Sequence, residues 1–386
     1  MRSLTRSTWM VMLMVALGLT VGCTRKEPGG GGASGAALQQ LFLLGVTPYD
    51  STGTFQVSLV GISDQNEVVD LRQTALTVTV DSISYAAFKD QSLPGESRPA
   101  VIRVADPQGS RLFSGQDSVY QVQILGNQFQ TPTGGGDLGV SMNFDNSGSL
   151  SGTDPNNLRI PAAKDFIRLL NSLGNPNDLV GVFGFSRTSG DANGDGIDDY
   201  YFEIMQDYTQ PGDTAALFAA IDSLTANALT PLWCSLVLNM DYAASRNWTN
   251  RRPVLVSFTD GGDNDSYICP RKNYATDTVT SQDITVDSVI AVAQRTSTQI
   301  FFVALSYSST DMQTIASQTG GLVARVDSAD ALQQIFRARG YSIQGGYNQL
   351  RMQVQPLPPA YMNIYLTLQA CSGGQCRQVH IRVPAY

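Results

Sequence analysis

The chain has 386 residues, and its 25 basic and 33 acidic residues give a formal net charge of −8. This acidic balance argues against a nucleic acid partner, because phosphate backbones are bound through clusters of Lys and Arg. The sequence contains one histidine, which leaves almost no material for histidine-based acid–base catalysis or for a zinc hydrolase.

Residues 1–22 have the organisation of an export signal. Two arginines precede an apolar run over residues 9–19, which is too short to span a bilayer as a mature helix. The run ends in a small residue before Cys23 and so resembles a bacterial lipoprotein cleavage site, although Thr20 stands where Leu is usual. We expect cleavage before Cys23 and lipidation of that cysteine, which would anchor the chain in the cell envelope; an ordinary cleaved signal is the alternative.

Residues 23–37 are mostly Gly, Ser and Ala, and we expect a flexible tether because such a segment cannot bury enough apolar surface to offset its ordering entropy. Residues 38–136 then show short runs of alternating apolar residues, separated by Asp, Asn, Gly and Pro. The runs are FQVSLVGI, LTVTVDSISY, AVIRVAD and SVYQVQIL. This pattern predicts the antiparallel strands of a β-sandwich.

Residues 137–340 alternate predicted strands with predicted helices. The strands LGVSMNF, LVGVFGFS, YYFEIMQ, PVLVSF, QIFFVAL and LVARV include several that are almost wholly apolar, as expected when both faces of a parallel sheet are covered. Helices are predicted at 161–173, 214–224, 230–238, 286–295, 311–317 and 329–339. The alternation is typical of an α/β fold with a doubly wound, mostly parallel, Rossmann-like sheet.

Polar residues follow two of these strands and precede one helix. Asp145, Ser147 and Ser149 form the pattern D-x-S-x-S at the end of the first strand, which puts one carboxylate and two hydroxyls on one turn. Asp260 ends another strand in VLVSFTDGG, and Thr230 precedes a helix in ALTPLW. Ligands of doubly wound sheets bind at the carboxyl ends of strands, so these residues should converge. Taken singly, Thr230 is also typical of a helix cap and Asp260 of a turn.

The order of these motifs resembles the von Willebrand factor type A family over residues 137–340. The resemblance implies a metal-ion-dependent adhesion site formed by Asp145, Ser147, Ser149, Thr230 and Asp260. The residue types suit Mg²⁺, or Mn²⁺ in its place, because hard cations take carboxylate and hydroxyl oxygens. In this family the metal keeps an open position for a carboxylate of the partner, and the resemblance implies the same here.

A second cation loop is suggested by the acidic stretch DANGDGIDD, where oxygen donors stand at positions one, three, five and nine, with a backbone carbonyl at position seven. These positions are Asp191, Asn193, Asp195, Asp199 and, for the carbonyl, Ile197. The final Glu of an EF-hand is missing and a strand follows at once, so the loop looks more like the calcium loops of integrin-type β-propeller repeats. We expect Ca²⁺ to rigidify this insertion, with a solvated acidic turn as the alternative.

Four cysteines besides Cys23 favour disulfides in an exported chain. Cys371 and Cys376 flank a four-residue turn between two predicted strands, so their pairing needs only a closed hairpin. Three pairings are formally possible, and this local one leaves Cys234 with Cys269. That bridge would tie the loop of Thr230 to the segment 261–280, which carries Asp263, Asp265, Tyr267 and Tyr274 and could select partners; an ordinary surface loop is the alternative.

Residues 341–386 return to a β pattern in LRMQVQP, MNIYLTLQA and QVHIRVP. This segment is short for an independent domain, so we expect it to pair with residues 38–136 and complete the β-sandwich that flanks the α/β domain; two separate β modules are the rival arrangement. His380 lies in the last of these strands, and we expect it to be a plain strand residue.

These features predict a lipid-anchored envelope protein that binds a protein or matrix ligand through a Mg²⁺ site, and no enzyme activity. The alternative is a structural or assembly subunit of an envelope complex that uses the same domain for constitutive contacts. A metal-dependent hydrolase acting through Asp145 and Asp260 is least supported, because no nucleophile or general base accompanies these carboxylates.

Overall fold

The structure is a computed structural model, and part of the chain is described in it. The described residues are 37–85, 102–103, 120–131, 137–173, 175–186, 190–191, 194, 196–226, 229–246, 248, 250–306, 308–326, 329–358 and 362–384. The predicted export signal, Cys23 and nearly all of the predicted tether therefore lie outside the described residues.

The α/β part is built on a six-stranded sheet in the order β14-β13-β10-β7-β8-β9. Its strands are β7 (Asp137–Asp145), β8 (Leu179–Phe185), β9 (Glu203–Thr209), β10 (Arg251–Thr259), β13 (Gln299–Leu305) and β14 (Val323–Val326). All neighbours run parallel except β8 and β9. The prediction of a mostly parallel sheet is confirmed, and the edge strand β9 begins at Glu203 because residues 198–201 form a turn.

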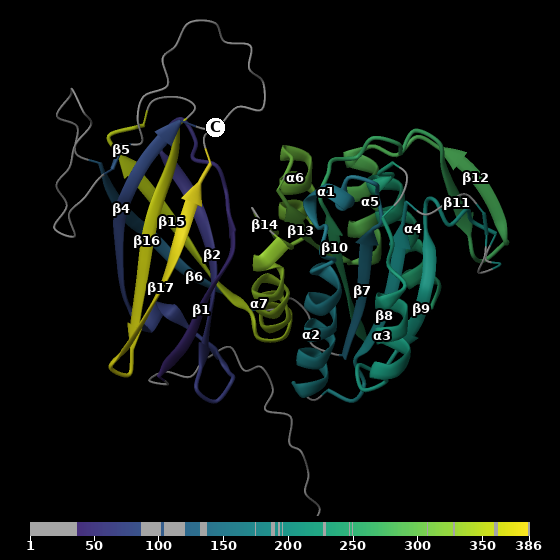
Figure 1. Ribbon diagram of the computed structural model, residues 1–386, viewed down its shortest axis with the longest axis horizontal. Helices are drawn as coiled ribbons and strands as arrows, with labels where there is room; N and C mark the ends of the chain where they lie inside the picture. Colours follow the sequence, from purple (N-terminus) through teal and green to yellow (C-terminus); the bar gives the residue numbers. More distant parts are fainter. Residues whose placement is uncertain are drawn as a thin grey trace, which may run out of the picture. The chain divides into compact units, whose positions relative to one another are not determined.

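Helices pack on both faces of this sheet (Figure 1). They are α1 (Leu150–Thr153), α2 (Arg159–Ser172), α3 (Thr214–Asp222), α4 (Leu232–Ser245), α5 (Val286–Thr296), α6 (Thr310–Gln318) and α7 (Leu332–Gly345), with a 3₁₀ turn at Ala329–Ala331. Side chains of one strand alternate between the faces. On β10, Val256 joins the cluster with Phe166 of α2 and Phe336 of α7, whereas Leu255 joins the cluster with Leu236 of α4.

Two helices are longer than the sequence pattern predicts. The helix α4 continues past 238 to Ser245, because Met240 and Tyr242 extend its buried face. The helix α7 continues to Gly345 and so crosses the predicted domain boundary at 340, because Tyr341 and Ile343 are buried as well. In both helices apolar packing prolongs the element beyond its predicted end.

The remaining strands form two antiparallel sheets that share one core. They are β1 (Leu38–Val46), β2 (Thr54–Ser63), β3 (Val68–Val69), β4 (Ala75–Tyr85), β5 (Ile102–Arg103), β6 (Gln121–Gln130), β15 (Tyr347–Gln355), β16 (Met362–Ser372) and β17 (Gln375–Val383), with a 3₁₀ turn at Leu71–Gln73. One sheet has the order β1-β2-β15-β6, with β3 on β2, and the other has the order β17-β16-β4-β5. Both sheets therefore combine amino-terminal and carboxy-terminal strands, as the purple and yellow ribbons of Figure 1 show.

The strand β15 shows how alternating side chains form the core of these two sheets. In β15, Leu350, Met352 and Val354 are buried while the residues between them are more exposed. They pack in one cluster with Leu59 of β2 and Leu366 of β16. Because β15 lies between β2 and β6, removing it would separate the strands of the first sheet.

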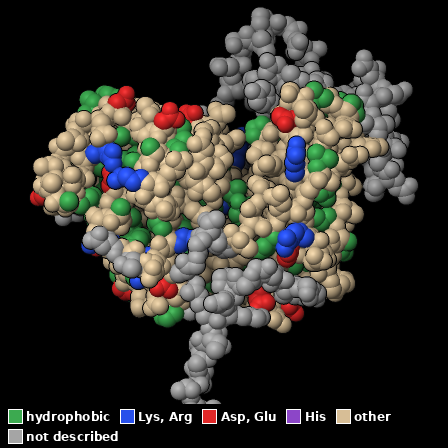
Figure 2. Space-filling model, turned by 180° about the vertical axis from the view of Figure 1, so that it is seen from behind, with side chains coloured by type: hydrophobic (Ala, Val, Ile, Leu, Met, Phe, Trp, Pro, Cys, Tyr) green, Lys and Arg blue, Asp and Glu red, His purple; other side chains and the backbone are tan. Residues whose placement is uncertain are grey.

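Charged residues make up 15% of the chain. On the face shown in Figure 2, Lys, Arg, Asp and Glu side chains are scattered singly or in small groups among neutral ones. None of the helices in the described part of the chain is long and apolar enough to cross a membrane.

Candidate functional site

The candidate site lies where β7 and β10 end. These strands are parallel neighbours, and the register that pairs Phe144 with Phe258 brings Asp145 and Asp260 to the same edge of the sheet. Thr259, which is fully buried, donates a hydrogen bond from its Oγ1 to Asp145 Oδ2 at 2.6 Å. The sequence pattern did not single out Thr259, although its position beside Asp260 at a strand end was a usable signal.

The loop after β7 folds back over the carboxylate of Asp145. The backbone N–H of Ser147 donates to Asp145 Oδ1 at 2.7 Å, and the hydroxyls of Ser147 and Ser149 lie 3.0 Å apart. Ser149 Oγ then donates to Asp260 Oδ1 at 2.8 Å. A further hydroxyl that the sequence pattern did not reveal, that of Thr153 on α1, donates to Asp260 Oδ2.

Thr230 joins this group from the loop before α4. A Cβ atom placed on Gly261 would lie 4.0 Å from Thr230 Oγ1, so the hydroxyl lies beside the turn that follows Asp260. The backbone of Thr230 is held by Asn264, which accepts at Oδ1 from Thr230 N at 2.8 Å and donates from its own N to Thr230 O at 3.0 Å. All five residues of the predicted site therefore lie at one edge of the sheet.

The first turn of α4 takes its caps from another loop. Asp263 Oδ1 accepts from Trp233 N at 2.9 Å, and Ser266 Oγ accepts from Cys234 N at 3.0 Å. These two side chains satisfy backbone donors that a helix leaves free at its start. The alternative interpretation of Thr230 as the cap of α4 is therefore not what the structure shows.

The electrostatics of the site favour a bound cation. Asp145 is fully buried, and desolvation raises the pKa of its carboxyl to about 6, against the opposing effect of hydrogen bonds from Thr259 and Ser147. Asp260 is 6% exposed and its charge raises that pKa further. Neither carboxylate forms an ion pair with any described Lys or Arg. Two buried carboxylates without a counter-charge, together with three hydroxyls, are a donor set that fits Mg²⁺.

The described residues contain no group of three or more His, Cys, Asp or Glu side chains placed to hold a metal. The site above does not contradict this observation, because three of its five donors are hydroxyls.

Both predicted disulfides are confirmed. Cys234 on α4 is bonded to Cys269, with Cα atoms 5.4 Å apart, and Cys371 is bonded to Cys376 across the β16–β17 turn. Cys269 begins a hairpin formed by β11 (Cys269–Asn273) and β12 (Thr278–Gln282). The first bridge therefore ties this hairpin to the helix that follows Thr230.

The four residues named earlier in the segment 261–280 have different surroundings. Asp263 caps α4, as described above, and Asp265 accepts a hydrogen bond from the hydroxyl of Tyr200. Tyr274 packs against Tyr242 of α4 with ring centroids 5.7 Å apart, whereas Tyr267 is 65% exposed. Only Tyr267 among the four presents a largely free side chain to solvent.

The predicted calcium loop is described only in part, because Asn193 and Asp195 lie outside the described residues. In the described part, Asp191 Oδ2 accepts from Gly196 N at 2.9 Å, and the side chain of Ile197 is buried in the cluster beneath α4. Asp199 is 5% exposed. The loop is thus anchored at both ends, and its ligand set remains a prediction.

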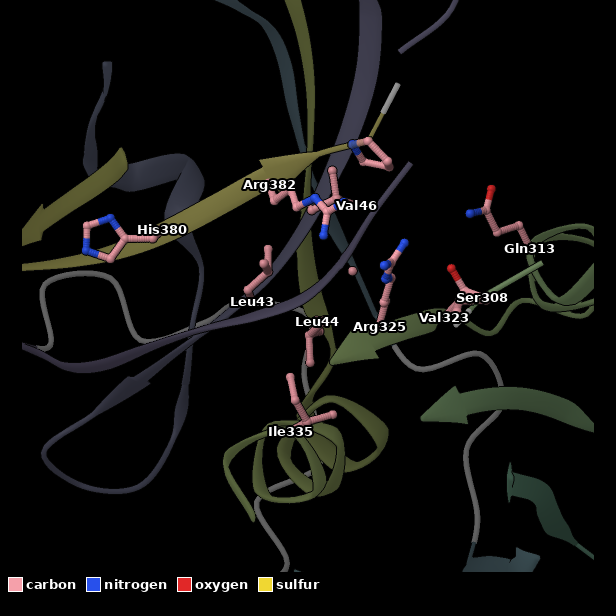
Figure 3. Close-up of a pocket in the computed structure, with 12 residues that line it drawn as sticks. Leu43, Leu44, Val46, Ser308, Gln313, Val323, Arg325, Ile335, His380 and Arg382 are labelled. Atoms are coloured by element: carbon pink, nitrogen blue, oxygen red, sulfur yellow. The ribbon is translucent and has the colours of Figure 1, made fainter. Parts of the chain in front are cut away.

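A separate cavity of about 180 Å³ lies between β1 and the strand β14. Arg325 of β14 and Arg382 of β17 both extend toward it (Figure 3). None of its described lining residues carries a carboxylate, and His380, which also lines it, lies 2.9 Å from Thr367 Oγ1 through its Nδ1. The cavity shares no residue with the five of the candidate site.

A comparison of the sequence with models of protein families finds no match, and neither does a comparison with curated proteins. Solved structures that resemble the chain include a von Willebrand factor type A protein from Catenulispora acidiphila, with 12% identity and a TM-score of 0.38 over 69% of this chain and 73% of that one. The pilus adhesin SpaC from Lactobacillus rhamnosus GG has 12% identity and a TM-score of 0.41 over 69% of this chain and 46% of that one. The von Willebrand factor domain of the type V pili tip protein Mfa5 from Porphyromonas gingivalis has 12% identity and a TM-score of 0.38 over 57% and 97%.

The chain thus spans less than half of the SpaC adhesin and nearly all of the Mfa5 domain. At these identities the likeness concerns the fold alone.

Proposed function

We propose that the chain is an exported, lipid-anchored envelope protein that binds a protein or matrix partner through a Mg²⁺-dependent adhesion site. The site belongs to a doubly wound α/β domain of the von Willebrand factor type A kind, flanked by the β-sandwich. The observation that carries the proposal is the hydrogen bond of Ser149 to Asp260 beside the buried Asp145, since it joins two loops of one oxygen-rich site.

Each residue has a distinct role in the proposed site. Asp145 and Asp260 would supply negative charge, and the hydroxyls of Ser147, Ser149 and Thr230 would complete the donor set without neutralising the ion. Mg²⁺, or Mn²⁺ in its place, would offer an open coordination position to a carboxylate of the partner. Thr259 and Thr153 orient the two carboxylates through the hydrogen bonds described above.

Binding without catalysis is the better-supported use of this site. The single histidine lies on β17, and Cys234, Cys269, Cys371 and Cys376 are all held in disulfides. The described residues around Asp145 and Asp260 therefore include no imidazole or free thiol that could act as a general base or nucleophile.

The function is tested on the detergent-solubilised full chain. Calorimetric titration should detect Mg²⁺, and immobilised protein should capture a partner from envelope extracts in Mg²⁺ and release it in EDTA. The variant Asp145→Ala should lose both properties, whereas Asp64→Ala, which removes an exposed carboxylate after β2, should keep them. A chain that binds no Mg²⁺ would refute the proposal. A partner retained in EDTA and by Asp145→Ala would indicate constitutive contacts of an assembly subunit.

The membrane anchor is tested separately at Cys23. The variant Cys23→Ser should no longer incorporate radiolabelled palmitate and should leave the membrane fraction of the producing cells. If the variant is still labelled and still sediments with membranes, the lipid anchor is not at Cys23.

A further inference from the structure

The loop between β10 and β11 is unusually well anchored for a surface loop. Ser266 is buried, it caps α4 through its hydroxyl, and its carbonyl accepts a hydrogen bond from Ile284 N at 3.1 Å. Cys269, three positions on, is buried in the disulfide to Cys234. The two residues between these anchors, Tyr267 and Ile268, are therefore held in place on both sides.

Tyr267 and Ile268 nevertheless point largely to solvent, with 65% and 52% of their surfaces exposed. Leu229, which directly precedes Thr230, is 55% exposed, and the backbone of Thr230 is bonded to Asn264 of the same loop as Tyr267. We call Leu229, Tyr267 and Ile268 the apolar rim. Among the described residues, six large hydrophobic side chains are markedly exposed, and three of them are these residues, on the two loops that carry Thr230 and follow Asp260.

Two further aromatic residues lie against the same loop. The hydroxyl of Tyr200 donates to Asp265, and the rings of Tyr200 and Tyr201 pack edge to face with centroids 4.9 Å apart. Burial raises the pKa of Tyr201, and the charges of Asp265 and Tyr267 raise it further. An aromatic pair is therefore bonded to the loop that carries Tyr267 and Ile268.

Exposed apolar side chains scattered singly over a surface need no explanation, but adjacent exposed apolar residues on an anchored loop, such as Tyr267 and Ile268, do. Aromatic and aliphatic side chains of this kind carry much of the binding energy of protein interfaces. Because this loop is already ordered by caps and a disulfide, little conformational entropy would be lost when a partner covers it.

The charge around the rim limits which partner can bind. The stretches 146–154, 229–234 and 260–269 contain no Lys or Arg, and they carry Asp260, Asp263 and Asp265. Asp154 also lies there, but it is buried in an ion pair with Arg159. A partner rich in acidic residues would meet like charge from Asp260, Asp263 and Asp265. The complementary partner offers one carboxylate to the metal. The residues beside that carboxylate are apolar, neutral or basic.

We propose that the apolar rim is a second contact surface of the metal site, and that the partner presents an extended segment with one Asp or Glu and a large apolar residue close to it in the sequence. The carboxylate binds at the metal and the apolar side chain packs on Leu229, Tyr267 and Ile268. This inference rests on the proposed function.

Phage-displayed random heptapeptides with a fixed central Asp test the proposal. They are panned on the immobilised full chain in Mg²⁺ and eluted with EDTA. We expect enriched peptides to carry an aromatic or aliphatic residue near the Asp, and their synthetic forms to bind about tenfold more weakly to a Tyr267→Ser/Ile268→Ser variant. Calorimetry should show unchanged Mg²⁺ affinity in that variant. A Leu125→Ser/Leu357→Ser variant, which removes two exposed apolar residues of the β-sandwich, should bind like the parent chain.

Two outcomes would overturn the proposal in different ways. Mg²⁺-dependent peptides without an apolar preference, or with equal affinity for the rim variant, would refute the rim and leave the proposed function intact. If no peptide elutes with EDTA from a chain that binds Mg²⁺, neither the rim nor carboxylate recognition holds.

Discussion

Ser149 Oγ donates to Asp260 Oδ1 at 2.8 Å although the two residues are 111 positions apart in the chain. With the bond from Thr259 to Asp145 Oδ2, it joins the loops after β7 and β10 into one hydrogen-bonded group. The loops of the site are therefore preorganised by contacts within the chain. Preorganised ligands lose little freedom on binding, which favours tight and specific recognition.

The variant Asp145→Asn should stabilise the chain in the absence of divalent cations. The folded-state pKa of about 6 lies above the ordinary value of 3.8, so the folded state holds this proton more tightly than the unfolded state. This tighter proton binding adds to the free energy of unfolding at low pH. The added stability, up to about 3 kcal/mol, is lost as the pH rises from about 4 to about 6. The variant lacks this loss, so in EDTA its melting temperature should exceed that of the parent chain at pH 7.5 and approach it near pH 4.5.

Addition of Mg²⁺ provides the control for that experiment. A cation that binds only the folded state raises the melting temperature, so Mg²⁺ at pH 7.5 should stabilise the parent chain and leave Asp145→Asn unchanged. If the variant melts below the parent chain in EDTA at every pH, burial of the Asp145 charge does not destabilise the folded chain.

The variant Thr259→Val should destabilise the chain and weaken Mg²⁺ binding. The substitution keeps the shape of a fully buried side chain and removes the hydroxyl that donates to Asp145 Oδ2. Losing a hydrogen bond to a buried carboxylate costs about 1–3 kcal/mol. Urea unfolding and calorimetric Mg²⁺ titration would measure the two effects. Thr314→Val, which removes an exposed hydroxyl bonded to the backbone of α6, should change neither; equal effects of the two variants would contradict the role of Thr259.

The two disulfides should contribute unequally to stability. The Cys234–Cys269 bridge closes a loop with a sequence separation of 35, and the Cys371–Cys376 bridge one with a separation of 5. Loop-closure entropy predicts a loss of about 4 kcal/mol for Cys234→Ala/Cys269→Ala and about 2 kcal/mol for Cys371→Ala/Cys376→Ala. Chemical denaturation under non-reducing conditions would compare them. Because the first bridge ties the segment after Asp260 to α4, only its removal should also lower Mg²⁺ affinity.

The predicted Ca²⁺ site should be independent of the Mg²⁺ site. Calorimetry should detect Ca²⁺ binding that Asp191→Ala abolishes, since Asp191 is the first predicted ligand and orders the loop through Gly196 N. The Mg²⁺ response of that variant should stay as in the parent chain. If Ca²⁺ binds equally well to the variant, the loop is a solvated acidic turn.

Local patterns in the sequence predict much of this molecule. The triplet Asp145, Ser147 and Ser149 is recognisable because its members stand two positions apart on one turn, and Cys371 and Cys376 because one tight turn separates them. The apolar runs of β10 and β13 predict a covered parallel sheet for a similar reason, since neighbours along a strand determine its pattern. These features depend on residues close in the chain, and sequence analysis reads them directly.

The tertiary structure decides which distant residues meet. Thr259 bonds Asp145 because β7 and β10 pair in one particular register, and a shift of one residue would turn that hydroxyl to the other face of the sheet. Asp263 and Ser266 cap α4, and Tyr267 becomes an exposed neighbour of the site, only because the loop after β10 folds against that helix. The sequence determined the kinds of ligand in the site, whereas packing over long separations decided their partners and the rim that surrounds them.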